Sequence, residues 1–182
     1  VFVKATRRGQ VQKIVREHYL RDDIAWEPDG GWADGPCIII DTNVALHQID
    51  FLDGASASGA IKNVILLQTV LEEVKHRNVS VYNRLKTMVQ TVGRRFHVFS
   101  NEHHADTYIK GLGGESANDR NDRAIRTAAR WYSGQLEPRE VVLVTNDADC
   151  RRKAAEEALA CHTVHAFVQE RCPELRDLLA AA

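Results

Sequence analysis

Three short, wholly apolar runs constrain the fold of this chain most, because each ends shortly before an acidic residue. The runs occupy residues 37–40, 64–67 and 141–144. Continuous apolar runs of this length are typical of strands that are buried on both faces, as in parallel sheets. Asp41 follows the first run directly, Glu73 lies beyond the second and Asp147 beyond the third. Ligands of open parallel sheets bind outside the carboxyl ends of the strands, so we expect these acids to meet at one edge.

Helical patterns separate the predicted strands, and this alternation indicates the fold. We expect strands at residues 37–41, 63–68, 97–100, 140–145 and 162–165. We expect helices at residues 43–50, 69–77, 79–91, 121–132 and 147–159. Strands that alternate with helices predict a three-layer α/β/α sandwich on a mostly parallel five-stranded sheet. The small residues 54–60 are predicted to form a mobile loop. Turn-forming residues 29–36 divide an N-terminal extension, residues 1–36, from a core domain, residues 37–182.

Four carboxylates form the candidate site, since Asp122 opens the predicted helix 121–132 and joins the three acids that follow strands. Carboxylates at one edge repel one another unless a cation neutralises them. Oxygen ligands suit Mg²⁺ or Mn²⁺, so we predict one or two such ions. The residues expected to orient the carboxylates are Thr42, Asn43, Thr145 and Asn146.

Neighbouring acids are given structural roles. Thr69 and Glu72 have the spacing of a capping box, which would leave Glu73 free to face the site. Asp119 is expected to offset the dipole of its helix. Asp149 lies two residues further into the next helix than Asp147. For a lone acid after a strand, a helix N-cap is the alternative interpretation.

Charge and cysteine content narrow the function classes. A net charge of −1 is unlike that of free-standing duplex-DNA binders. Local basic residues remain, and Lys75, Arg77 and Arg123 are candidate phosphate contacts, with a solvated helix face as the alternative. The four cysteines form no C-x-x-C pair, which favours reduced thiols over a zinc ribbon. No run approaches the ~18 apolar residues of a membrane span, so no membrane partner is expected.

The acidic positions lie in motifs that resemble those of a known family. Residues 41–43, Glu73, residues 121–123 and residues 145–147 resemble the four motifs of PIN-domain ribonucleases. Further segments resemble the N-terminal PIN region of the catalytic nuclease subunit of the eukaryotic RNA exosome, and with them the resemblance covers nearly the whole chain. These segments are residues 16–24, 46–50, 101–104 and 117–125.

The resemblance implies a metal-dependent endoribonuclease domain, with Mn²⁺ favoured, that belongs to a larger nuclease for rRNA processing and RNA decay. It implies that the catalytic acids are Asp41, Glu73, Asp122 and Asp147. It also implies a contribution to tethering the subunit to the exosome ring, and a location in the nucleus, including the nucleolus, with the cytoplasm as a second location. We expect single-stranded RNA as substrate, because no motif for double-stranded RNA is present. Hydrolysis would leave a 5′-phosphate and a 3′-hydroxyl.

One departure from the family concerns attachment to the ring. Many members carry a cysteine triad after the segment that matches residues 16–24, and residues 25–32 contain no cysteine. The resemblance therefore does not transfer the role of the triad to this chain. Trp26 and Trp32 either form a partner surface or fasten the extension to the core. The alternative function is a catalytically silent PIN fold that binds RNA or docks the nuclease.

Overall fold

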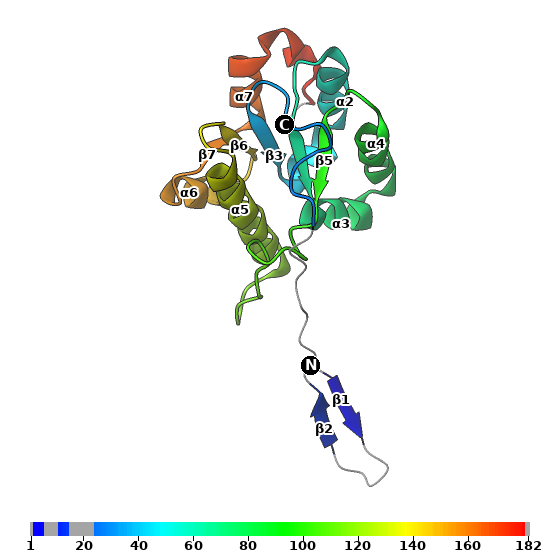
Figure 1. Cartoon of the computed structure of the whole chain (residues 1–182), viewed down its shortest axis with the longest axis vertical. Helices are drawn as coiled ribbons and strands as arrows, with labels where there is room; N and C mark the ends of the chain where they lie inside the picture. The colour runs from blue at the N-terminus through cyan, green and yellow to red at the C-terminus, as the bar shows by residue number, and fades with distance from the viewer. Residues whose placement is uncertain (1, 6–10, 15–23, 181–182) are drawn as a thin grey trace.

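A five-stranded parallel sheet forms the centre of the molecule (Figure 1). The computed structural model describes residues 2–5, 11–14 and 24–180. The strands are β3 (Cys37–Ile40), β4 (Val64–Leu67), β5 (Phe96–Phe99), β6 (Val141–Val144) and β7 (Ala160–His162). Their order is β5-β4-β3-β6-β7, and every neighbouring pair is parallel. The predicted fold class is confirmed.

The direction of chain progress across the sheet reverses beside β3. The chain adds β4 and β5 on one side of β3, and then returns to add β6 and β7 on the other side. Strands β3 and β6 are direct neighbours, with Ile38 opposite Val142. The carboxyl ends of β3 and β6 are therefore the topological switch point, where open α/β sheets bind ligands.

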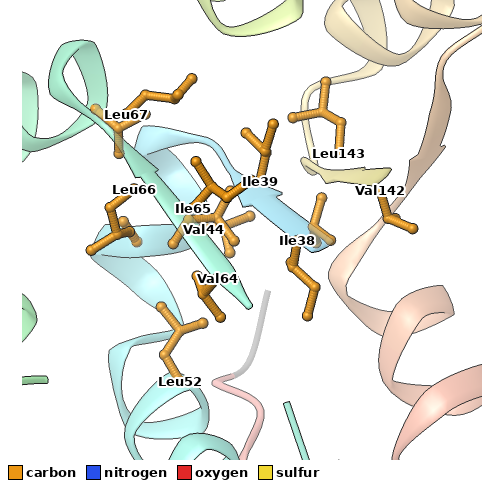
Figure 2. Close-up of a cluster of buried hydrophobic side chains, with 14 of the residues drawn as sticks. Ile38, Ile39, Val44, Leu52, Val64, Ile65, Leu66, Leu67, Val142 and Leu143 are labelled. Atoms are coloured by element: carbon orange, nitrogen blue, oxygen red, sulfur yellow. The ribbon is translucent and has the colours of Figure 1, made fainter. Parts of the chain in front are cut away.

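The core forms because the central strands are apolar along their whole length. All four residues of β3, β4 and β6 are buried. Figure 2 shows side chains of these strands gathered with Val44 and Leu52 from the helices that follow β3. Burial on both faces explains why these strands show no alternation of polar and apolar residues.

Helices flank the sheet and complete the layers. They are α1 (Thr42–His47), α2 (Ile49–Ser58), α3 (Gln68–Arg77), α4 (Val79–Gln90), α5 (Ala117–Leu136), α6 (Ala148–Glu156), α7 (Val164–Arg171) and the 3₁₀ helix η1 (Pro173–Leu178). Helices α3 and α4 contact β4 and β5, whereas α5 and α6 contact β6 and β7. In Figure 1, α5 and α6 accordingly lie on the opposite side of the molecule from α3 and α4.

The predicted mobile loop at residues 54–60 was wrong, because α2 continues through Ser58. Its small residues serve packing. Ala55 is fully buried, and a Cβ atom on Gly54 would lie 2.6 Å from a methyl carbon of Leu178. Gly59 then ends the helix in the left-handed conformation, with φ of 75°, as a C-cap glycine does.

Three boundaries near the site also differ from prediction. Helix α5 begins at Ala117, so Asp122 lies in its second turn and does not open it. Helix α3 begins at Gln68, so Thr69 is already inside it and the predicted capping box does not form. Strand β7 ends at His162, which is the residue at which the predicted strand 162–165 begins.

Two tryptophans of the predicted extension pack on the core. Trp26 and Trp32 contact the ring of Tyr132, with centroids 6.5 and 6.2 Å away. The Tyr132 hydroxyl donates a hydrogen bond to the Trp26 carbonyl at 2.7 Å. The interpretation that the tryptophans fasten the extension is confirmed.

Strands β1 (Phe2–Ala5) and β2 (Val11–Ile14) form an antiparallel pair. Residues 16–23 of the exosome-like segment lie outside the described residues.

Candidate active site

Asp41 lies at the switch point and has two structural partners. It is the N-cap of α1, where its Oδ1 accepts a hydrogen bond from the Val44 amide at 2.6 Å. Its Oδ2 accepts a hydrogen bond from the Thr145 hydroxyl, which follows β6. Only 4% of Asp41 is exposed, and burial raises the pKa of its carboxyl, with a smaller contribution from the nearby Asp147. Asp41 therefore caps a helix and also lies beside a second acid of the candidate site.

Asp147 lies across the switch point from Asp41 and repeats its arrangement. It is the N-cap of α6, where its Oδ1 accepts a hydrogen bond from the Cys150 amide at 2.7 Å. The Thr145 hydroxyl oxygen accepts a hydrogen bond from the Asp147 amide at 3.0 Å while it donates to Asp41. One buried threonine thus joins both acids.

Glu73 reaches the same edge from α3. Its Oε2 accepts hydrogen bonds from the Thr42 hydroxyl at 2.9 Å and from the Asn121 side-chain amide at 3.1 Å. Its Oε1 lies 3.4 Å from the Arg77 guanidinium. Asn121 is the functional candidate that sequence reasoning missed, and its position directly before Asp122 was the available signal.

Asp122 completes the set from α5. The pKa of its carboxyl is raised to about 6, first by burial and then by the charges of Asp147 and Asp41, with a smaller contribution from Glu73. The Arg126 guanidinium opposes this shift. The other three acids all act on Asp122, so the four carboxylates share one electrostatic environment.

The donor set fits a hard divalent cation, because it consists of carboxylate oxygens with raised pKa values at Asp41 and Asp122. Among the described residues, no group of three His, Cys, Asp or Glu side chains is already arranged around a common metal position.

Comparison with known proteins decides the family. The model of the PIN domain family matches residues 38–165. The chain belongs to the PIN domain family. It is 47% identical to "Exosome complex exonuclease RRP44 homolog A" of Arabidopsis thaliana and 42% identical to "Exosome complex exonuclease RRP44" of Homo sapiens, with 99% and 98% of this chain covered. These matches cover 20% and 22% of the relatives, so the chain spans about a fifth of their length.

A solved structure supports the same assignment. The T. brucei RRP44 PIN domain has a TM-score of 0.72 and 30% identity, over 87% of this chain and 97% of that one. The five-stranded parallel sheet and its acidic edge therefore belong to a PIN domain similar to those of RRP44-type exosome nucleases.

The four residues predicted to orient the acids of the PIN domain divide into two pairs. Thr42 and Thr145 donate hydrogen bonds to carboxylates. Asn43 instead accepts a hydrogen bond from Arg77 at 3.1 Å, and Asn146 accepts one from the Val164 amide at 3.1 Å. The side chains of the two asparagines thus have other partners, while the Asn43 backbone amide donates a hydrogen bond to Asp41. The orienting role of both asparagines stays a prediction.

The predicted phosphate contacts lie in three different places. Arg77 lies beside Glu73. The ammonium nitrogen of Lys75 lies 5.7 Å from the centre of the Tyr82 ring. Arg123 is paired with Glu115 at 2.7 Å. Of the three, only Arg77 contacts one of the four carboxylates.

Neighbouring acids of the PIN domain have other partners. Asp119 forms a hydrogen bond with the N-cap residue Ser116 at 2.6 Å, in keeping with its predicted structural role. Asp149 pairs with Arg152 at 2.7 Å, and Glu72 accepts a hydrogen bond from Gln68 at 2.7 Å. None of these three acids is among the carboxylates that act on Asp122.

Proposed function

We propose that this PIN domain is a divalent-metal-dependent endoribonuclease that cleaves single-stranded RNA. The observation that carries the proposal is the gathering of four carboxylates from four separate segments at the switch point of the sheet. Burial and then the charges of the other three acids raise the pKa of Asp122, and such perturbed groups are typical of functional sites. The structural role of Asp41 as an N-cap does not require the other three acids.

The residues that would hold Mn²⁺ or Mg²⁺, as one or two ions, are Asp41, Glu73, Asp122 and Asp147. When bound, such an ion supplies an activated water and offsets the charge that develops on the phosphate. Thr145, Thr42 and Asn121 fix the directions of the carboxylate oxygens through the hydrogen bonds described above. Arg77, which is half exposed beside Glu73, would position the RNA phosphate. Cleavage would leave a 5′-phosphate and a 3′-hydroxyl.

The names of the relatives suggest the cellular setting. RRP44 is named as an exonuclease of the exosome complex, and this chain matches about a fifth of it. We therefore propose that the PIN domain belongs to a larger RNA-processing and decay nuclease. Its proposed partners are exosome ring subunits, and its proposed location is the nucleus, including the nucleolus, with the cytoplasm second. No helix of the described residues has the length and apolar character needed to cross a membrane.

A catalytically silent docking or RNA-binding module is the second candidate. The net charge of −1 favours the docking role, because affinity for RNA phosphates increases with positive charge. The two candidates differ in one measurable property, which is hydrolysis of RNA that has no ends.

The deciding experiment incubates circular single-stranded RNA with the purified chain and Mn²⁺, Mg²⁺ or EDTA. We expect linear products with Mn²⁺ and none with EDTA. Asp147→Asn should remove cleavage, whereas Asp149→Asn, a matched change two residues away on the exposed surface, should retain it. Intact circles in every metal would favour the silent module.

A further inference from the structure

Two neighbouring cavities lie along α3 and share a wall. The first has a volume of about 540 Å³ and reaches Glu73 and Asn121 of the acidic site. The second has a volume of about 270 Å³ and reaches Lys75 and Tyr82. Gln68 and Glu72 line both cavities, and a hydrogen bond of 2.7 Å joins their side chains. The acidic site therefore adjoins a second recess across the side chains of Gln68 and Glu72.

The order of side chains around α3 explains this continuity. Successive residues of an α-helix are rotated by about 100°, because one turn contains 3.6 residues. This rotation places side chains around the helix in the order Glu73, His76, Glu72, Lys75. His76, Glu72 and Lys75 are exposed, and His76 lines the first cavity. An open surface thus leads from the acidic site around α3 to α4, which contacts it (Figure 1).

The far end of this surface pairs a cation with an aromatic ring. Lys75 comes from α3, and its ammonium nitrogen lies 5.7 Å from the centre of the Tyr82 ring on α4. Among the residues that the structure describes, no carboxylate lies within ion-pairing distance of Lys75. Proteins that bind single-stranded nucleic acids combine aromatic rings, on which bases stack, with cations that contact the phosphates.

Other basic side chains near the first cavity are already paired. Arg120 holds Glu102 with two hydrogen bonds, at 2.6 and 2.5 Å, and Arg123 holds Glu115. Glu72, on the wall that both cavities share, carries a charge that would oppose a phosphate. Lys75 is therefore the available cation at the far end.

We propose that single-stranded RNA extends from the acidic site across α3, so that one base stacks on Tyr82 and a neighbouring phosphate contacts Lys75. The near end of this path rests on the proposed function of the four acids. The path predicts that affinity depends on RNA length, because a short RNA bound at the acids does not reach Tyr82. It also predicts that Glu72 weakens binding by repelling the strand.

The test measures binding of fluorescent single-stranded RNAs of graded length by anisotropy in EDTA, which prevents metal-dependent cleavage. Tyr82→Leu removes the ring but keeps an apolar side chain, and we expect it to weaken binding of the longest RNA about tenfold, the size of one stacked base. Binding of the shortest RNA should not change. Tyr82→Phe should behave like the unmodified chain, and a thermal melt of each variant checks that it folds.

Charge variants test the phosphate contact independently. Lys75→Ala should reduce the slope of log affinity against log salt by about 0.7, the value for one phosphate contact with a single strand. Glu72→Gln should tighten binding of the longest RNA. The matched controls are Lys86→Ala, an exposed lysine of α4, and Tyr108→Leu, an exposed tyrosine. We expect neither control to change binding.

Two outcomes would overturn the path. One is that Tyr82→Leu weakens the binding of short and long RNA equally. The other is that Lys75→Ala and Lys86→Ala change the slope of log affinity against log salt by the same amount. These outcomes concern binding in EDTA, so they are distinct from failure of the nuclease proposal, which would appear as circular RNA that stays intact in Mn²⁺.

Discussion

The four acids divide into two pairs that the fold holds in different ways. Asp41 and Asp147 follow strands β3 and β6, cap the next helices and meet through Thr145. Glu73 and Asp122 lie within helices α3 and α5, and each is about half-buried. The first pair therefore caps helices as well as lining the site. Within residues 24–180, the carboxylates of the second pair form hydrogen bonds only with side chains.

This difference predicts two kinds of mutational outcome. Truncation of a strand-end acid removes a helix cap, so stability and activity fall together. Replacement of a helix acid removes a repelling charge from the site and breaks no backbone hydrogen bond. Loss of activity without loss of stability is therefore expected only for Glu73 and Asp122, and each prediction below tests that division.

The largest expected effect is loss of cleavage in Asp122→Asn. The change preserves shape but removes a negative ligand and relieves repulsion with Asp147 and Asp41. We expect circular RNA to remain intact in Mn²⁺, while urea unfolding in EDTA shows a stability no lower than that of the unmodified chain. Efficient cleavage by Asp122→Asn would mean that α5 contributes no ligand.

The second prediction concerns stabilisation by metal. A cation that binds only the folded site raises stability by roughly 2.7 kcal/mol at about a hundredfold excess over its Kd. We expect Mn²⁺ to raise the melting temperature of the unmodified chain at fixed ionic strength. Asp41→Asn and Glu73→Gln should lose most of the shift, since each removes one carboxylate, and Asp149→Asn should keep it. A full shift in Asp41→Asn would leave that residue as a helix cap alone.

The centre of the sheet was predictable because β3, β4 and β6 are continuous apolar runs. Residues 37–40, 64–67 and 141–144 are strands in the structure as well. The stretch 54–60 was not predictable in the same way, because small residues are equally common in mobile loops and in tightly packed helices. Only the contact of Gly54 with Leu178, more than a hundred residues away, distinguishes the two.

Strand ends could be located from the sequence, whereas the start of helix α3 could not. The acids follow strand ends, so parallel topology alone brings Asp41 and Asp147 together. The capping box of Thr69 and Glu72 failed, since Thr69 instead forms hydrogen bonds with Asn101 and Glu102, which follow β5. Lys75 lies only two residues after Glu73 in the sequence. The rotation of the α-helix nevertheless directs the two side chains to different sides of α3. The assignment of catalytic and metal-binding roles stays a prediction.

The third prediction separates capping from charge at the strand ends. Asp41→Ala removes the hydrogen bond to the Val44 amide and should cost about 0.5–2 kcal/mol of stability in EDTA. Asp41→Asn keeps a capping oxygen and should cost less. Glu72→Ala is the matched control, because Glu72 caps no helix, and we expect little change from it. Equal losses in all three variants, measured by urea unfolding, would contradict the division between the two pairs.

The smallest expected effect is a pH dependence of stability in the absence of metal. The pKa of the Asp122 carboxyl is about 6 in the folded chain, above its ordinary value of 3.8. Between these two values the folded state binds more protons than the unfolded state, so stability falls as the pH rises from about 4 to about 6. Asp122→Asn lacks this group, and its melting temperature in EDTA should fall less over the same interval. Asp41 also has a raised pKa and acts in the same direction in both proteins, so the difference between the two melting curves reports Asp122 together with its coupling to the strand-end acids. Parallel curves would show that Asp122 does not share the field of the strand-end acids, and would separate α5 from the site.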